Sequence, residues 1–372
     1  MCGIVGVYNF RDARPVDPGA LGRACDAMAH RGPDGDGTYF DDSAGVGLGH
    51  RRLSIIDLGG GAQPMSTNDK TVWITFNGEI YNFRELRDDL ERAGYQFHTS
   101  SDTEVILYGY QHWGDDVVCR LRGMFAFVLW DATKRRLLLA RDHAGIKPIY
   151  YRIRDGQIAF ASETKALESF AGEKFGVDPT GLYAYIRMGY TPAPYTMFEG
   201  VQTLAPGTRL VADGPGTTVS RFWNYTPKPL DPPPSIEEAA AELLELYSNA
   251  VRRNLVSDVP VGLLLSGGLD SGLLLSLMNQ FGTGWKTFTV GFGSEFEDDE
   301  LDDAAHVAAA LKSDHTSVHI TREQFERSLS HIVGYLEEPV STASIVPMYF
   351  VSQRAREDVK VALIGQGPEE LL

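Results

Sequence analysis

Two stretches of the sequence combine residue types that can carry out chemistry, and the first is SGGLDS at 266–271. It follows the apolar run 261–265 and precedes an apolar segment. A strand, a small-residue loop and a helix together form an anion site, because glycine lets backbone N–H groups approach phosphate oxygens and a helix N-terminus favours negative charge. Ser266 and Ser271 add hydroxyl donors, and Asp270 would hold Mg²⁺ rather than phosphate. The alternative is an ordinary strand-to-helix turn, and no Walker-type Gly-Lys-Ser/Thr follows.

The second stretch is the N-terminus. Met1 precedes a small residue, so we expect its removal and a free α-amino group on Cys2. Such an amine has a reference pKa of about 8 and is partly neutral near pH 7, so it could act as the base for its own thiol. The alternative is that Cys2 is a small buried apolar residue.

Two further positions allow more than one interpretation. Asn77-Gly78 follows the strand-like stretch 71–76. It is either a turn or a side-chain amide next to a backbone N–H, which is what an oxyanion hole needs. Asp102 begins a helical stretch, where aspartate is commonly an N-cap.

The first half of the chain is rich in strands, which we expect to be mostly antiparallel. The expected strands are 46–56, 71–76, 124–130, 136–140 and 158–161, and the expected helices are 18–30, 83–93, 103–113 and 179–188. A proline-dense stretch at 225–234 indicates a semi-rigid linker. Ser235 and Glu238 fit a capping box that opens a helix to about residue 255.

The second half alternates strands and helices, which predicts a parallel α/β sheet. The expected strands are 261–265, 286–291, 315–320 and 359–364, and the expected helices are 269–280, 302–311, 322–336 and 345–357. Ligands of such sheets bind beyond the carboxyl ends of the strands. This places SGGLDS close to residues 290–292 and 365–367.

Composition limits the classes of function. The 372 residues carry a net charge of −16, which argues against nucleic acid and anionic membranes as partners. The three cysteines are scattered, form no zinc-type pair and suit a reducing cytoplasm. Without a signal peptide or an apolar run of membrane-spanning length, we expect a cytoplasmic protein.

Several motifs in one order carry a resemblance to a known family. They are Cys2-Gly3-Ile4-Val5-Gly6, HRGPD at 30–34, HRRLSIIDL at 50–58, FNGEIYN at 76–82, SDTEV at 101–105, RDHAGIKPIYY at 141–151 and FASETKAL at 160–167. They resemble a class II glutamine amidotransferase domain. With SGGLDS, their order is similar to that of the glutamine-hydrolysing asparagine synthetases.

The resemblance implies two domains of α+β and α/β type. An N-terminal nucleophile (Ntn) hydrolase-type αββα sandwich, the glutaminase, would occupy 2–210. A Pro-rich linker would occupy 211–234, and a parallel α/β ATP-pyrophosphatase domain 235–372. Members of the family continue beyond the position equivalent to Leu372, so the second domain is expected to be incomplete.

The resemblance also assigns residues to glutamine. Cys2 would attack the side-chain amide of glutamine, and Asn77 with the Gly78 N–H would stabilise the oxyanion. Arg52 would pair with the α-carboxylate, for which its bidentate fork is suited. Glu79 and Asp102 would hold the α-ammonium.

In the second domain the resemblance implies ATP and Mg²⁺ as cofactors. Aspartate would be adenylated and then attacked by ammonia. Leu264 and Val290 would flank the adenine, Gln366 stands at the position linked to the adenylate intermediate, and Asp270 and Glu369 would hold the metal. The implied ATP-binding residues are Leu264, Ser266, Gly267, Gly268, Asp270, Ser271, Val290, Ile364 and Gly365.

Departures from the family near residue 364, together with the expected incompleteness of the second domain, keep alternatives open. Gln366 replaces a carboxylate, Ile364 lacks a hydroxyl beside the nucleotide, and Glu369 has a longer arm than the usual aspartate. The first expectation is ATP-dependent asparagine synthesis from aspartate, with AMP and pyrophosphate released. The alternatives are amidation of another carboxylate, as in cell-wall or secondary-metabolite chemistry, and a glutaminase whose synthetase half is inactive. We also expect a homodimer.

Overall fold

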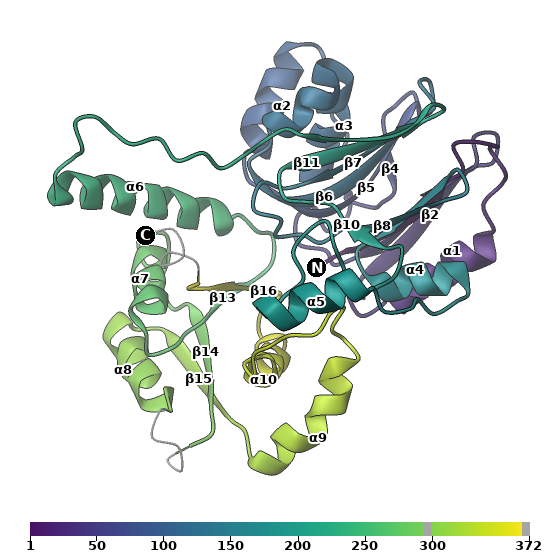
Figure 1. Ribbon diagram of the computed structural model, residues 1–372. Coiled ribbons are helices and arrows are strands. Elements are labelled where there is room, and N and C mark those ends of the chain that lie inside the picture. Colours follow the sequence, from purple (N-terminus) through teal and green to yellow (C-terminus); the bar gives the residue numbers. More distant parts are fainter. Residues whose placement is uncertain (294–298, 367–372) are drawn as a thin grey trace. The chain divides into compact units, whose positions relative to one another are not determined.

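The chain forms two compact units in the computed structural model, which describes residues 1–293 and 299–366 (Figure 1). The first unit comprises Met1–Thr226 with Glu337–Pro339, and the second comprises Pro227–Leu336 with Val340–Leu372. None of the helices in the described residues is long and apolar enough to cross a membrane.

The first unit is built on two six-stranded antiparallel sheets. One has the order β10-β8-β9-β1-β3-β2 and the other β12-β11-β7-β6-β5-β4. The strands of the first sheet are β1 (Gly3–Tyr8), β2 (Gly35–Asp41), β3 (Val46–Arg52), β8 (Tyr150–Arg154), β9 (Gln157–Ala161) and β10 (Gln202–Thr203). The strands of the second are β4 (Met65–Ser66), β5 (Val72–Ile80), β6 (Gly123–Asp131), β7 (Arg136–Arg141), β11 (Thr208–Asp213) and β12 (Gly216–Arg221).

The two sheets face each other and helices cover their outer sides. Side chains alternate along a strand, so in β1 Ile4 and Tyr8 join the core between the sheets, which also contains Trp130 of β6. Val5 and Val7 point the other way and pack with Leu21 of α1. The helices that cover the first sheet are α1 (Pro18–Ala27) and α4 (Thr164–Ala171), and those beside the second are α2 (Phe83–Arg92) and α3 (Asp102–Trp113). Figure 1 shows these layers, which confirm the αββα sandwich.

The expected linker differs from the structure in its first half. β11 and β12 form a hairpin, and β11 pairs with β7, so 211–221 belongs to the second sheet rather than to a linker. The first unit accordingly ends at Thr226. It also contains α5 (Pro179–Met188), as the sequence predicts, and the 3₁₀ helix η1 (Gly114–Cys119).

The second unit contains a parallel sheet with the order β15-β14-β13-β16. Its strands are β13 (Val261–Leu264), β14 (Lys286–Gly291), β15 (Asp314–His319) and β16 (Val361–Ile364). Its helices are α6 (Ile236–Asn254), α7 (Leu269–Met278), α8 (Leu301–Leu311), α9 (Arg322–Val333) and α10 (Ile345–Ala355). The predicted elements of this half are confirmed to within a few residues, and so is the capping box of Ser235 and Glu238 at the start of α6.

Helices cover both faces of this sheet. Leu263 and Leu265 pack with Leu275 of α7 and Ala304 of α8 on one face. Phe288 of β14 packs with Val351 and Ala355 of α10 on the other face. Because all four strands run in the same direction, their carboxyl ends share one edge, where the SGGLDS loop begins.

Candidate active site

Cys2 lies directly before β1, a central strand of the first sheet. The Leu53 N–H donates to its sulfur, with 3.4 Å between N and Sγ, and Sγ lies 3.6 Å from the Leu53 carbonyl oxygen. Burial raises the pKa of the Cys2 thiol above its ordinary value. The thiol therefore needs a nearby base or positive charge to become a thiolate nucleophile.

The terminal amine next to Cys2 belongs to Met1. Burial is the main cause that lowers the pKa of this amine to about 6, and the positive charges of Arg31 and Lys147 lower it further. An amine in this environment is mostly neutral at pH 7, so it can accept a proton.

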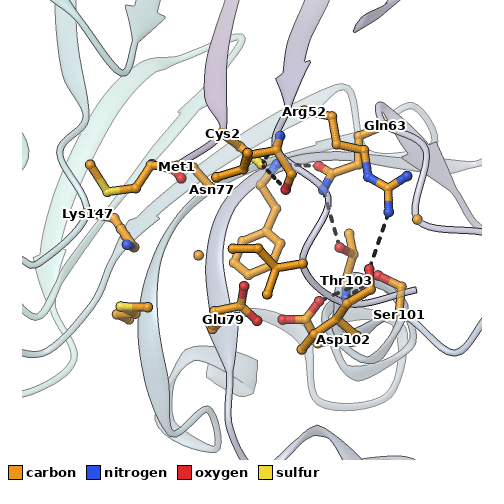
Figure 2. A pocket seen from close by; sticks show the side chains of 17 residues that line it. Met1, Cys2, Arg52, Gln63, Asn77, Glu79, Ser101, Asp102, Thr103 and Lys147 are labelled. Carbon is orange, nitrogen blue, oxygen red and sulfur yellow. Dashed lines mark hydrogen bonds between the residues drawn. The ribbon is translucent and has the colours of Figure 1, made fainter. Parts of the chain in front are cut away.

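Asn77 and Gly78 lie inside β5, which continues to Ile80, and not in a turn. Asn77 pairs with Ala126 and Gly78 with Phe125 across the ladder to β6. The Asn77 side chain is 1% exposed, and its Nδ2 has no hydrogen-bond partner among the described residues. Figure 2 shows Asn77 next to Cys2. A buried amide donor without a partner is costly, so this donor is available for an oxygen that is not part of the chain.

Gly78 occupies a position that no larger residue could take. A Cβ atom there would lie 2.2 Å from the carbonyl oxygen of Met124. Glycine thus allows β5 and β6 to approach closely next to Asn77.

Arg52, the last residue of β3, holds an uncompensated positive charge at the same pocket. Its Nη1 donates to the Leu58 carbonyl at 3.2 Å, and its Nη2 donates to the carbonyls of Ile56 at 3.3 Å and Asp57 at 2.5 Å. Within the described part of the chain, the guanidinium has no carboxylate partner. It is therefore fixed in place by backbone carbonyls and can pair with a carboxylate ligand.

Two carboxylates line the pocket opposite the cation. Glu79 is on β5, and Asp102 is the first residue of α3, where Ser101 and not Asp102 is the N-cap. Asp102 is buried, and its Oδ2 accepts a hydrogen bond from the Ile80 N–H at 2.9 Å. Burial raises the pKa of Asp102 to about 6. A cationic ligand group would relieve this burial of negative charge.

The pocket brings together all the residues that the sequence assigns to glutamine: Cys2, Arg52, Asn77, Gly78, Glu79 and Asp102. They come from β3, β5, α3 and the N-terminus. Figure 2 shows Cys2, Arg52, Asn77, Glu79 and Asp102 around one space. The arrangement places one fixed cation and two carboxylates around a thiol and an unpaired amide donor. It suits an amino acid whose side chain reaches the thiol.

Gln63 and Lys147 are pocket residues to which the sequence assigned no role. Gln63 links β5 to α3, because its Oε1 accepts from the Phe76 N–H at 2.7 Å and its Nε2 donates to Thr103 Oγ1 at 3.3 Å. Lys147 lines the pocket although it is far from the other residues in sequence. Nothing in the sequence singles out Gln63, whereas a lysine in the segment RDHAGIKPIYY offered a weak indication.

Neighbouring charged residues hold the surrounding loops. Arg31 donates from Nε to the Cys2 carbonyl and from Nη1 to Glu163 Oε1, both at 2.9 Å. Asp34 Oδ2 accepts from the Ser54 N–H at 2.8 Å. Arg51 forms an ion pair with Asp26 outside the pocket. These contacts give Arg31, Asp34 and Arg51 structural roles around the pocket.

The SGGLDS loop of the second unit connects β13 to α7. The hydroxyl oxygens of Ser266 and Ser271 lie 2.9 Å apart, and the Ser271 Oγ accepts from the Ser266 N–H at 3.1 Å. The Gly268 N–H donates to Ser266 Oγ at 3.2 Å. The hydroxyls therefore fix the loop in a tight turn that precedes the N-terminus of α7.

The other residues assigned to ATP lie at the same edge of the sheet. Gly365 packs against the loop so closely that a Cβ atom would lie 2.6 Å from the Ser271 nitrogen. Leu264 pairs with Ile364 across β13 and β16, and both Leu264 and Val290 pack against the core around Phe288. A cavity next to the loop is lined by helix α6 and by Asp270, Ile364, Gly365 and Gln366, but not by Leu264 or Val290.

Few side chains in the described part of the chain are placed to bind Mg²⁺. Across residues 1–293 and 299–366, no group of three or more His, Cys, Asp or Glu side chains is placed to hold a metal ion. Glu369 lies outside the described residues. Asp270 alone fits Mg²⁺ that is bound mainly by phosphate oxygens, which is a common way for proteins to hold this ion.

Comparisons with known proteins agree with the division of the chain into two units. Residues 1–223 match the family "Glutamine amidotransferase domain", and residues 242–372 match the family "Asparagine synthase". A Bacillus subtilis protein named asparagine synthetase (glutamine-hydrolyzing) 1 is 40% identical, over 100% of this chain and 58% of its own length. A Methanocaldococcus jannaschii protein named putative asparagine synthetase (glutamine-hydrolyzing) 2 is 32% identical, over 100% of this chain and 75% of its own length.

The chain spans little more than half the length of some of these relatives. It covers 58% of the B. subtilis protein. It also covers 56% of a Mycobacterium tuberculosis protein named putative asparagine synthetase (glutamine-hydrolyzing), to which it is 39% identical over 95% of its residues. Among solved structures, a glutamine phosphoribosylpyrophosphate amidotransferase from B. subtilis matches with a TM-score of 0.45 and 16% identity, over 88% of this chain and 70% of that chain. That similarity is too low to support a conclusion about function.

Proposed function

Because the chain belongs to the family of glutamine-hydrolysing asparagine synthetases, we propose that it takes part in ATP-dependent synthesis of asparagine from aspartate. The first unit would release ammonia from glutamine. The second would activate the side-chain carboxylate of aspartate with ATP as an acyl-adenylate, releasing pyrophosphate, and ammonia would then displace AMP. Glutamine, aspartate and ATP are the proposed substrates.

One observation carries the proposal for the first unit. The unpaired Nδ2 of the buried Asn77 lies in the same pocket as the Cys2 thiol, the Arg52 guanidinium and two carboxylates. This set matches each polar group of glutamine. Arg52 suits the α-carboxylate, Glu79 and Asp102 suit the α-ammonium, and Asn77 suits the oxygen of the side-chain amide.

The chemistry follows from these positions. Cys2 Sγ would attack the side-chain carbonyl carbon of glutamine, and the carbonyl oxygen would become an oxyanion next to Asn77 Nδ2 and the Gly78 N–H. Ammonia would leave with a proton taken from the thiol by the terminal amine, and water would then hydrolyse the thioester to glutamate. This role of the amine requires the removal of Met1, which we include in the proposal.

Fewer residues of the proposed ATP site are described in the second unit. The role of this unit therefore rests on the family and on the SGGLDS loop. Ser266, Gly268 and the N-terminus of α7 would bind the pyrophosphate part of ATP. Mg²⁺, held by Asp270 together with phosphate oxygens, would neutralise the charge of the leaving pyrophosphate.

Pyrophosphate release from Mg-ATP tests the proposal, with aspartate present and either ammonia or glutamine as the nitrogen source. Release that depends on aspartate with both sources supports both half-reactions. If glutamine is hydrolysed to glutamate but no aspartate-dependent release occurs, the proposal fails for the second unit.

A second candidate function is amidation of another carboxylate by the same two half-reactions. Gln366 favours it, because an uncharged amide stands where the family carries a carboxylate and it lines the cavity next to Asp270. Pyrophosphate release with another carboxylic acid and not with aspartate would decide for it. The cytoplasmic location and the homodimer that the sequence suggests remain predictions.

Replacing Arg52 with alanine should weaken glutamine binding. The guanidinium would lose its charge-assisted hydrogen bonds to the α-carboxylate, which are worth about 1.5–3 kcal/mol, so we expect KM for glutamine to rise about 10- to 100-fold. Arg52→Lys should recover only part of this loss, since an ammonium cannot bind bidentately. Steady-state kinetics of glutamate release would measure both. An unchanged KM in Arg52→Ala would contradict the assignment.

Glutamine hydrolysis should depend on pH through Asp102. The pKa of Asp102 is about 6, and only the carboxylate form can hold the α-ammonium of glutamine. We therefore expect kcat/KM to fall about tenfold for each pH unit below pH 6. Above pH 6, the ionisation of Asp102 should cause no further change in kcat/KM. Asp102→Asn should lower kcat/KM and remove this limb of the pH profile.

Deprotonation of Asp102, which favours glutamine binding, should lower the stability of the folded protein. The folded-state pKa of Asp102 lies above the ordinary value of 3.8, so the folded state holds a proton that the unfolded state has already lost. Its contribution to stability therefore decreases as pH rises from about 4 to about 6 and stays low above that. Thermal unfolding without glutamine should show Asp102→Asn stabilised relative to wild type at pH 7 and not at pH 4. Equal differences at both values would contradict the burial argument.

A further inference from the structure

Lys147 is a buried lysine in the glutamine pocket that the proposed reaction leaves without a role. Its side chain is 6% exposed and lines the pocket with Cys2 and Glu79. Figure 2 shows it on the side of the pocket that also holds Met1, away from Arg52. Lysine is rarely buried, because its ammonium must leave water, so its presence in a reactive pocket calls for an explanation.

The loop before β8 holds Lys147 rigidly. The buried Asp142 carboxylate accepts hydrogen bonds from four backbone N–H groups, those of Phe125, Ala144, Ile146 and Lys147, at 2.9–3.1 Å. Arg141 donates from Nε to the Lys147 carbonyl at 3.0 Å and binds the Gly145 carbonyl as well. The buried Asp142 and the half-buried Arg141 thus fix the backbone of the loop that carries Lys147 at the pocket.

The Lys147 ammonium has no direct partner in the described residues, since neither a hydrogen bond nor an ion pair is found for its Nζ. Burial lowers the pKa of Lys147, and the charge of Arg31 lowers it too, whereas the charges of Glu79, Asp142 and Cys2 raise it. The amine therefore has two carboxylates nearby that favour its charged form, but neither is bound to it.

The charges around Cys2 come from several elements. The terminal amine, Glu79 on β5 and Arg52 at the end of β3 act on its thiol. Lys147 lines the same pocket, and the charge of Cys2 raises the pKa of Lys147. Arg52 is bound to the carbonyls of its own loop, and Arg31 is bound to Glu163. Of the two cationic side chains that line the described pocket, Arg52 is held by backbone carbonyls and Lys147 is not held by another group. Lys147 can therefore respond to a negative charge that forms on Cys2.

We propose that Lys147 is a positioning residue for the nucleophile, whose ammonium stabilises the Cys2 thiolate as it forms. This rests on the proposed function only in that Cys2 is the group that attacks glutamine. The ammonium sits on the side of the pocket opposite the site proposed for the α-carboxylate, so its effect should fall on the chemical step and not on glutamine binding.

The experiment compares wild type with Lys147→Met, which keeps the length of the side chain and removes its charge, and with Lys147→Arg, which restores the charge. The rate of Cys2 alkylation by iodoacetamide is measured against pH, without glutamine, by mass spectrometry of the N-terminal peptide. A positive charge close to a thiol lowers its pKa by about one to three units, so we expect the alkylation profile of Lys147→Met to shift up by at least about one unit. Lys147→Arg should lie close to wild type.

Glutamate release gives the second readout. In Lys147→Met we expect kcat to fall about tenfold at pH 7 with KM for glutamine changed less than about twofold, since one unit in thiol pKa alters the thiolate fraction about tenfold. The matched control is Lys174→Met, which removes the same charge from an exposed side chain of the same unit that pairs with Glu168. It should leave both readouts unchanged.

The results separate the possible roles of Lys147. An alkylation profile that does not move in Lys147→Met overturns the proposal, and so does a rise in KM at constant kcat, which would assign Lys147 to substrate binding. If Lys147→Met does not fold, as judged by thermal unfolding, Lys147→Gln replaces it with the same expectations. If wild type hydrolyses no glutamine, the proposed function fails, while the alkylation profiles still decide whether Lys147 acts on Cys2.

Discussion

Replacing Cys2 with alanine is expected to abolish glutamine hydrolysis, with a loss of about 10⁴-fold or more, because binding and oxyanion stabilisation alone cannot replace a covalent nucleophile. The thiol lies in the pocket that holds Arg52, Asn77 and Asp102, so no other described cysteine can take its place. Glutamate release from glutamine, followed at saturating glutamine, measures the loss.

The variant also separates the two half-reactions. If ammonia made at the first site is used at the second, Cys2→Ala should keep pyrophosphate release with aspartate and added ammonia within about twofold of wild type, since added ammonia replaces the product of the Cys2 reaction. Cys119→Ala is a matched control, because Cys119 is an exposed free cysteine outside the pocket. Loss of both activities in Cys2→Ala, or of either in Cys119→Ala, would contradict the two-site proposal.

The sequence predicts the second unit well because its strands and helices are long and bounded by clear breaks. Strand 286–291 is found with the same bounds, and the capping box at Ser235 is present. Each of these features depends on residues that are near each other in the chain. Local patterns of this kind carry most of the information about parallel α/β units.

The expected linker at 211–234 fails where long-range pairing decides. Residues 217–221 show no apolar alternation, because β12 is an edge strand that is mostly exposed. It is a strand because β11 has already paired with β7 and offers it a partner. The local sequence does not show that such a partner strand exists. The predicted linker therefore begins too early, because the proline-dense stretch that follows β12 was the clearest local signal.

The sequence leaves two interpretations of Asn77-Gly78 for a related reason, and the structure excludes the turn. The dipeptide is typical of hairpin turns, and locally nothing distinguishes it from one. β6 extends the pairing of β5 to Ile80, so the dipeptide lies inside the ladder and the amide side chain is buried. Lys147 and Gln63 were missed because only tertiary folding brings Lys147 into the pocket of Cys2 and Gln63 into contact with Thr103.

Replacing Asn77 with alanine should remove the amide donor from the oxyanion site. Loss of one such donor lowers kcat by about 10²- to 10³-fold, and we expect KM for glutamine to change much less, because the bond strengthens as charge develops on the oxygen. Asn77→Asp keeps the shape of the side chain but offers a negative oxygen to the oxyanion, so its kcat should be lower still. Steady-state glutamate release would show whether kcat or KM carries the loss.

The matched control is Asn82→Ala, and the free energy of unfolding is compared between the two variants. Asn82 is a buried asparagine two residues beyond β5. Its Nδ2 donates to the Arg120 carbonyl at 3.0 Å, and its Oδ1 accepts from the Arg122 N–H at 2.8 Å. Asn82→Ala should therefore lower the free energy of unfolding by about 1–3 kcal/mol through the partners it leaves unpaired. Asn77→Ala leaves no partner of Nδ2 behind and should cost less stability while costing far more activity. If Asn77→Ala unfolds as readily as Asn82→Ala and keeps its kcat, Asn77 is a structural residue, and the oxyanion must be stabilised elsewhere.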